Sequence, residues 1–186
     1  MRRDRGEEKR FNIWFVWDYE KEQQHLDHLS QEGIHLTKPG LFRSGFTRDR
    51  SVRYVYRLDY QPGLRRKRLN HEYLELFKDS GWESVGSCNN WYYFRRPWQP
   101  ETTHEIYTDV ASLKGHYQRI QWLLGGVLCA ELLDLLVNLN LFVVNPQRHH
   151  VATFTLPLFI FQAVITAFLA CGFLVIRRKA IRVERV

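Results

Sequence analysis

The amino-acid sequence predicts an α+β domain that is followed by two transmembrane helices. A β-α-β-β pattern occurs twice between residues 11 and 97, charges are dense before residue 119, and two long apolar segments near the C-terminus contain no Lys or Arg. The mean hydropathy of −0.39 averages these two unlike halves. The predicted division is a charged tail at 1–10, the α+β domain at 11–97, an amphipathic juxtamembrane helix or linker at 98–119, a helical hairpin at 120–176 and a basic tail at 177–186.

The first β-α-β-β unit begins with a strand-like segment at 11–19, which is rich in aromatic and branched residues. A helix is predicted over 20–32, with Leu26 and Leu29 turned inward. Gly33 stands where a helix commonly ends with a residue in the left-handed conformation. Strands at 34–36 and 41–48 complete the unit.

The second unit repeats this order. A strand-like segment at 52–60 ends in Asp-Tyr, as the first one does. A helix follows over 70–80, with Leu74 and Phe77 turned inward and Gly81 at its end. Strands at 82–85 and 91–96 complete the unit.

Two such units are expected to pair into one antiparallel or mixed sheet with both helices on one face, which is a ferredoxin-like sandwich. Alternation along the first strand predicts which side chains face the helices. These are Phe11, Ile13, Phe15 and Trp17.

The other face of this sheet is the predicted binding surface. An aromatic and basic face suits a small ligand, an anion, a protein partner or a second copy of the chain, and an ordinary solvated sheet face explains the same residues. The candidate ligand- or partner-binding residues are Trp14, Arg53, Arg57, Asp59 and Trp91.

A juxtamembrane helix is predicted from about Thr103, because apolar residues recur at helical spacing. It is expected to run into the first membrane span or to lie on the membrane surface, with a possible break at Gly115. The apolar residues are Ile106, Val110, Leu113 and Tyr117.

The segments 120–144 and 154–176 are each long enough to cross a hydrocarbon core about 30 Å thick, which takes about 20 helical residues. Pro157 is compatible with the first turn of the second helix, whose amides lack intrahelical partners. The connection at 145–151 is short, so the two helices should be antiparallel neighbours. The alternative, a buried hairpin in a soluble protein, would need a large soluble body around the helices.

The distribution of basic residues predicts the orientation of this hairpin. Lys114 and Arg119 precede the first span, while the connecting segment carries only Arg148. Because Lys and Arg are retained on the cytoplasmic side, both termini of this two-span cell-membrane protein should be cytoplasmic. The basic residues after the second span are Arg177, Arg178, Lys179, Arg182 and Arg185.

Polar residues in the middle of the spans have two possible roles. A centred carboxylate costs about 2.5–3.5 kcal/mol on insertion scales, so the face that carries it should avoid lipid. The residues either hold helices together by hydrogen bonds, across the hairpin or an oligomer, or form a proton or cation site. They are Glu131, Asp134 and Asn138 in the first span and Gln162 and Thr166 in the second.

Other chemistry has little support in the sequence. His25, Asp27 and His28 are explained by a metal site or, more simply, by solvated side chains, and Cys88 by a reactive or an inert thiol. The basic segment 65–68 suits anionic lipid better than nucleic acid. Three cysteines are too few for a disulfide framework and fit a reducing cytosol. We expect no metal, no cofactor and no nucleic-acid partner.

Several motifs occur in the order found in a known family. They stand at 17–22, 33–36, 56–60, 76–83, 90–97 and 106–109. Together they resemble the bacterial domain-of-unknown-function family 2812, over residues 11 to about 120. The resemblance implies an inner-membrane protein with a membrane hairpin, often encoded beside PadR-type transcriptional regulators, and it implies no reaction. The basic insert at 63–68 departs from the family pattern.

These observations predict a non-catalytic, membrane-anchored sensor or binding module rather than an enzyme. Its partners would be the lipid bilayer, further copies of the chain, and a small ligand or a cytosolic regulatory protein, in transcriptional or envelope-stress regulation. The alternative is a small oligomeric transport or channel-modulating protein that uses Glu131 and Asp134 as its ion path.

Overall fold

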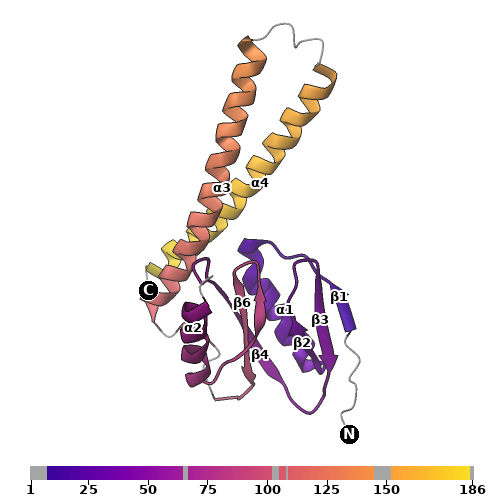
Figure 1. Cartoon of the computed structure of the whole chain (residues 1–186), viewed down its shortest axis with the longest axis vertical. Coiled ribbons are helices and arrows are strands. Elements are labelled where there is room, and N and C mark those ends of the chain that lie inside the picture. Colours follow the sequence, from indigo (N-terminus) through magenta and orange to yellow (C-terminus); the bar gives the residue numbers. More distant parts are fainter. Residues whose placement is uncertain (1–7, 65–66, 102–104, 108, 145–151, 185–186) are drawn as a thin grey trace. The chain divides into compact units, whose positions relative to one another are not determined.

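The computed structural model in Figure 1 describes residues 8–64, 67–101, 105–107, 109–144 and 152–184. Most of the charged N-terminal tail, Arg65, Arg66, the connection with Arg148, and Arg185 therefore lie outside the described residues. The chain divides into two compact units, Met1–Ser112 and Leu113–Val186. Each unit is described by itself below.

The first unit is an α+β domain with two three-stranded antiparallel sheets. The order β-α-β-β occurs twice, and in both sheets the last strand of the three lies in the centre. Sheet A, in the order β1-β3-β2, contains β1 (Glu8–Phe11), β2 (Ile34–Lys38) and β3 (Arg43–Arg48), with η1 (Val16–Asp18) and α1 (Tyr19–Gln31) between β1 and β2. Sheet B, in the order β4-β6-β5, contains β4 (Tyr54–Tyr60), β5 (Glu83–Cys88) and β6 (Trp91–Pro97), with α2 (Lys67–Asp79) between β4 and β5.

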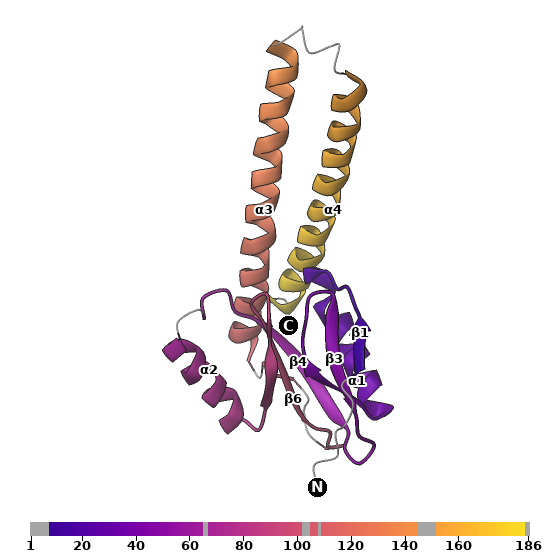
Figure 2. The same ribbon diagram turned by 45° about the vertical axis from the view of Figure 1, so that its right-hand side comes forward.

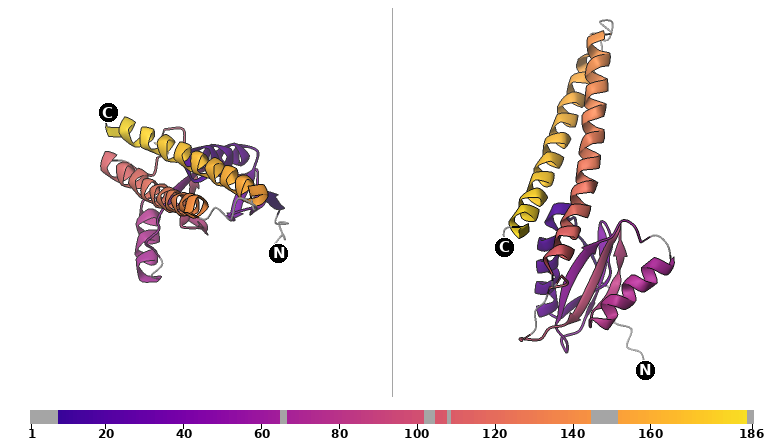
Figure 3. Two further views of the ribbon diagram at one scale, coloured as in Figure 1. Left: turned by 90° about the horizontal axis from the view of Figure 1, so that it is seen from above. Right: turned by 90° about the vertical axis from the view of Figure 1, so that its left-hand side faces the viewer.

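The two helices lie on opposite faces of sheet B, so the prediction of one sheet with both helices on one face is wrong. On β6, Tyr93 hydrogen-bonds to Glu22 of α1. The neighbouring residues Tyr92 and Phe94 pack with α2 instead. Adjacent residues of a strand point to opposite faces, and Figure 3 (right) shows a helix on each side of these strands.

Side chains of α1 also cover the free edge of sheet B at β4. Ser30 Oγ accepts a hydrogen bond from the Tyr54 amide, and Asp27 Oδ1 accepts one from the Tyr56 amide, each at 2.6 Å. An edge strand whose amides are capped by a helix presents fewer donors to another strand.

The first strand is shorter than predicted, and its apolar residues do not form a buried face. Pairing of β1 with β3 ends at Phe11, and a turn at 16–18 leads directly into α1. Phe11 is 70 % exposed, Ile13 51 % and Phe15 45 %, while Trp17 is half-buried. The alternation that predicted a longer strand therefore falls partly on backbone that is not in a strand after Phe11.

Both predicted glycine helix ends are present. Gly33 and Gly81 have φ angles of 76° and 81°, a conformation that favours glycine. After α2, the Gly81 amide donates to Lys78 and the Trp82 amide donates to Phe77, each at 2.9 Å. This end places the Trp82 ring in the core between α2 and sheet B, together with Tyr92, Phe94, Leu74 and Phe77.

The second unit contains two long helices that lie side by side in Figures 1 and 2. These helices are α3 (Val110–Val144), whose first residues lie in the first unit, and α4 (Ala152–Glu184). Both are long and apolar enough to cross a membrane, over Val110–Asn140 and Leu156–Val183. α3 begins later than the predicted Thr103 and continues through Gly115 without a break. Pro157 lies inside α4 near its start.

Candidate functional site

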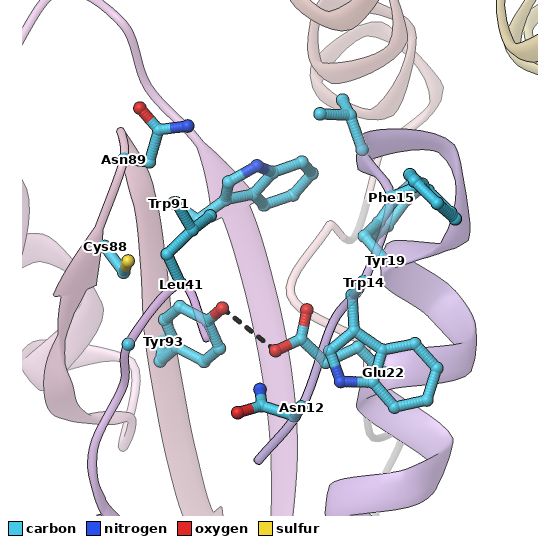
Figure 4. Close-up of a pocket in the computed structure, with 12 residues that line it drawn as sticks. Asn12, Trp14, Phe15, Tyr19, Glu22, Leu41, Cys88, Asn89, Trp91 and Tyr93 are labelled. Atoms are coloured by element: carbon cyan, nitrogen blue, oxygen red, sulfur yellow. Dashed lines mark hydrogen bonds between the residues drawn. The ribbon is translucent and has the colours of Figure 1, made fainter. Parts of the chain in front are cut away.

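A small cavity lies between the start of α1 and the end of sheet B that carries the β5–β6 turn (Figure 4). Its volume is about 60 Å³. Aromatic side chains surround it, and polar groups from α1, β5, β6 and the segment before α1 face it. It is lined by Asn12, Trp14, Phe15, Val16, Tyr19, Glu22, Gly40, Leu41, Cys88, Asn89, Trp91 and Tyr93.

Local sequence explains how these side chains meet. Tyr19 and Glu22 are three residues apart on α1, so they share a face of the helix. Trp91 and Tyr93 are two residues apart on β6 and share a face of the strand. The ring of Tyr19 stacks on that of Trp91, with ring centroids 5.3 Å apart. The tight β5–β6 turn uses Asn89, which adopts a positive φ that asparagine tolerates better than most residues.

Glu22 is the buried acidic group of this cavity. Its side chain is largely removed from water, and Tyr93 donates a hydrogen bond to Glu22 Oε1 at 2.9 Å. Burial raises the pKa of Glu22 to about 7, and the hydrogen bond from Tyr93 lowers it only in part. The carboxyl group therefore changes charge near neutral pH.

Two other titratable groups that line the cavity, Tyr93 and Cys88, stay uncharged around neutral pH. Burial and the nearby Glu22 raise the pKa of the Tyr93 hydroxyl far above its usual range. Burial, with a smaller effect of Glu22, also raises the pKa of the Cys88 thiol. Cys88 is therefore a poor nucleophile here, because reactivity requires the thiolate.

Asn12 contributes a second polar side chain to the cavity. Its Oδ1 is buried and has no hydrogen-bond partner among the described residues. Its backbone amide donates to the Phe42 carbonyl at 3.0 Å, which fixes the main chain beside the cavity. A buried acceptor without a donor is costly, so a ligand that brings a donor would be favoured here.

The structure divides the five predicted binding residues between this cavity and other places. Trp14 and Trp91 both line the cavity. Arg53 is exposed, and its guanidinium lies 4.3 Å from the centre of the Trp98 ring. Arg57 forms an ion pair with Asp27 at 3.0 Å and a weaker one with Glu105 at 3.5 Å.

Asp59, the fifth predicted residue, is buried in a hydrogen-bond network. Tyr73 donates to its Oδ2 at 2.6 Å, and Gln61 donates to the same oxygen at 2.9 Å. Tyr107 donates a short hydrogen bond to Oδ1. These contacts connect β4, α2 and the segment after β6, so the structure gives Asp59 a role in holding the domain together.

Glu22, Tyr93 and Asn12 are cavity residues that sequence reasoning missed. One signal could have found Glu22, because it lies four and seven residues before Leu26 and Leu29, on the inward face of the same helix. A Glu on a buried face is unusual unless it is paired or functional.

The polar residues of the hairpin meet across the two helices. Gln162 donates to Asp134 Oδ2 at 2.6 Å and to the Glu131 carbonyl at 3.5 Å. Asn138 donates to the same Asp134 oxygen at 3.0 Å. Among the described residues, the Thr166 hydroxyl is buried without a hydrogen-bond partner. The structure thus brings the side chains of Asp134, Asn138 and Gln162 into one hydrogen-bonded cluster, to which Glu131 contributes its backbone carbonyl.

The three residues considered for a metal site and judged more simply explained as solvated side chains make other contacts. His28 lies 3.7 Å from Glu32, and the ring of His25 packs on Trp14. Asp27 accepts hydrogen bonds from β4 and from Arg57. Among the described residues, no group of three or more His, Cys, Asp or Glu side chains could hold a metal ion.

The fold and the helices define a class of protein with an α+β domain and two helices able to span a membrane. The family model described as "Protein of unknown function (DUF2812)" matches residues 18–129, and the chain belongs to this family. The resemblance noted in the sequence is therefore confirmed. Neither the curated proteins nor the solved structures include a match to this chain.

Proposed function

We propose that this chain is a membrane-anchored binding module whose α+β domain takes a small ligand in the cavity at Glu22. The observation that carries the proposal is a buried carboxyl group that faces a cavity rather than a full set of protein partners. Glu22 is positioned to accept a hydrogen bond from a ligand, and Asn12 beside it has a side-chain oxygen that is buried without a partner among the described residues.

We assign the cavity to binding rather than to catalysis. A carboxyl group whose pKa is about 7 would also suit a general base. However, the described lining residues supply no Lys, Arg or His that could stabilise a developing negative charge. The thiol of Cys88 has a raised pKa and is poorly suited to nucleophilic attack.

Membrane anchoring is the second part of the proposal. Its support is that two helices have the length and composition of membrane spans. Their charge distribution favours a cytoplasmic location for both termini. Alkaline phosphatase fused in the 145–151 connection should be active, whereas a fusion after the C-terminus should be inactive; the opposite pattern would reverse the orientation.

We also propose that the two β-α-β-β segments are copies of one ancestral unit. Their identical strand order within each sheet supports this. So do the glycine helix ends at Gly33 and Gly81. Residues of both β-α-β-β segments line the cavity, because Glu22 belongs to the first segment and Tyr93 to the second.

Native mass spectrometry of the full-length protein, purified in detergent, tests the binding function. We expect a retained small molecule that is reduced at least about tenfold in occupancy in Glu22→Gln, since a buried charge-assisted contact is lost. Arg53→Gln is the control, because Arg53 belongs to the face predicted from sequence but lies outside the cavity. Loss in Arg53→Gln with retention in Glu22→Gln would contradict the proposed site.

A transport function is the weaker candidate for the polar cluster of the hairpin. The hydrogen bonds from Gln162 and Asn138 to Asp134 support a role in holding helices together. Proton or cation flux through reconstituted protein that disappears in Glu131→Gln with Asp134→Asn would instead favour transport.

A further inference from the structure

The carboxyl group of Glu22 makes the cavity complementary to a hydrogen-bond donor. Glu22 is an acceptor when ionised, and Asn12 Oδ1 is a buried acceptor without a partner among the described residues. The described lining residues contain no Lys, Arg or His. An anionic ligand would therefore meet no cationic group in the cavity, whereas a cationic donor would meet a carboxylate.

The aromatic walls of the cavity also favour a positively charged ligand. Five aromatic side chains line the cavity together with Glu22, and Figure 4 shows Trp91 above the Glu22–Tyr93 hydrogen bond and Trp14 beside Glu22. The faces of aromatic rings carry negative electrostatic potential and attract cations, most strongly when water is excluded. Besides Tyr93, which donates to Glu22, the aromatic lining residues are Trp14, Phe15, Tyr19 and Trp91.

We propose that this cavity binds a small organic ammonium group, with Glu22 as its counter-ion and the aromatic side chains as its walls. The inference rests on the proposed binding function and specifies the chemical class of the ligand. A cavity of about 60 Å³ has room for about four to six water-sized groups, because one water needs about 10–15 Å³ by this measure. An ion of the size of propylammonium meets this limit.

The groups around Glu22 make it the titrating residue of the cavity. Tyr93 from β6 and Cys88 from β5 have raised pKa values and stay neutral. His25, one turn further on α1, packs on Trp14, and burial, with the nearby His28 and Arg10, lowers its pKa. His25 is therefore also neutral where Glu22 gains its negative charge.

This arrangement fixes the expected pH dependence. Propylammonium keeps its charge up to about pH 10, since alkyl amines titrate like the Lys side chain. Its affinity should therefore rise about tenfold per pH unit below the pKa of Glu22, about 7, and level off above it. A neutral ligand of the same shape should show no such rise.

Calorimetric titration of the full-length protein in detergent, between pH 5.5 and 8.5, tests the proposal with propylammonium and 1-propanol. At pH 8 we expect propylammonium to bind at least about tenfold more tightly than 1-propanol, a difference that shrinks below pH 6. Glu22→Gln should abolish the preference. Tyr93→Phe should move the midpoint to higher pH, because the Tyr93 hydrogen bond lowers the pKa of Glu22.

Glu75→Gln is the matched control, because Glu75 lies on α2 and outside the cavity. It should leave both the affinity and the midpoint unchanged. A melting curve for each variant shows whether it is folded, and the pH profile of the unmodified protein tests the proposal without any variant.

The outcomes separate the ligand class from the binding function. Equal or tighter binding of 1-propanol, or a propylammonium affinity independent of pH, overturns the ammonium assignment and leaves the cavity as a binding site. Failure of both probes overturns the assignment as well, and the binding function falls with it only if native mass spectrometry finds no ligand that depends on Glu22. Binding of Nα-acetyl-lysinamide with the same pH profile supports the ammonium chemistry and indicates a lysine side chain as its source, whereas binding of propylammonium alone indicates a free amine.

Discussion

Two buried carboxyl groups of the domain are held in different ways. Asp59 accepts hydrogen bonds from Tyr73, Gln61 and Tyr107, which belong to separate segments of the domain. Glu22 accepts one from Tyr93 and faces a cavity. A carboxylate surrounded by protein donors stabilises the fold, whereas one that faces open space can take a ligand. This difference is why we place the site at Glu22.

The raised pKa of Glu22 predicts how stability depends on pH. The folded state holds a proton up to about pH 7, whereas the unfolded state releases it near 4.5, so the unfolded state binds fewer protons between these values. This group should therefore lower stability by about 3 kcal/mol as pH rises from about 4.5 to 7. Glu22→Gln should remove that slope. Thermal melts of both proteins across this range check it, and parallel curves would contradict the assigned pKa.

At the scale of elements, helix α1 determines how the two sheets are arranged. Asp27 and Ser30 cap amides of β4, and Glu22 on the same helix contacts β6. The sequence showed that this helix exists and that Leu26 and Leu29 are buried, because helical spacing reports the inward face. Spacing within one helix does not report which strand edge its polar residues will meet, so the sequence offered only a metal site or, more simply, solvated side chains for Asp27, His25 and His28.

The two glycine helix ends predict unequal costs of substitution. Gly81→Ala places a side chain in a left-handed conformation but in open space, so it should cost about 1–2 kcal/mol. Gly33→Ala should cost more, since its Cβ would lie 2.6 Å from Arg50 Cγ and 3.1 Å from the Asp49 carbonyl oxygen. Denaturation of the two variants checks this order, and equal losses would contradict the close packing at Gly33.

The hairpin provides a prediction with a matched control. Gln162→Leu removes the hydrogen bond to Asp134 and should destabilise the pair of helices by about 0.6 kcal/mol, up to about 1.7. Thr166→Val, one turn away, removes a hydroxyl that has no hydrogen-bond partner among the described residues and should cost nothing. Unfolding in mixed micelles measures both. Equal losses would show that Gln162 does not connect the helices.

At the scale of the whole molecule, the secondary-structure elements could be predicted from the sequence better than their arrangement in space. The helices, most strands and the two long apolar helices follow from periodicity, glycine positions and length. The arrangement of six strands in two sheets depends on long-range contacts, such as that of Tyr93 with Glu22, which local patterns do not encode. The candidate site depends on the same contacts, and so Trp14 and Trp91 were identified without Glu22.

The most direct test of the central claim is amide hydrogen exchange of the full-length protein at pH 8, with and without saturating propylammonium. With propylammonium bound, we expect slower exchange in two separate segments, 12–22 and 88–93, because residues of both line the cavity. No change in these segments, or a change confined to the neighbourhood of Arg53 and Arg57, would contradict an ammonium site at Glu22.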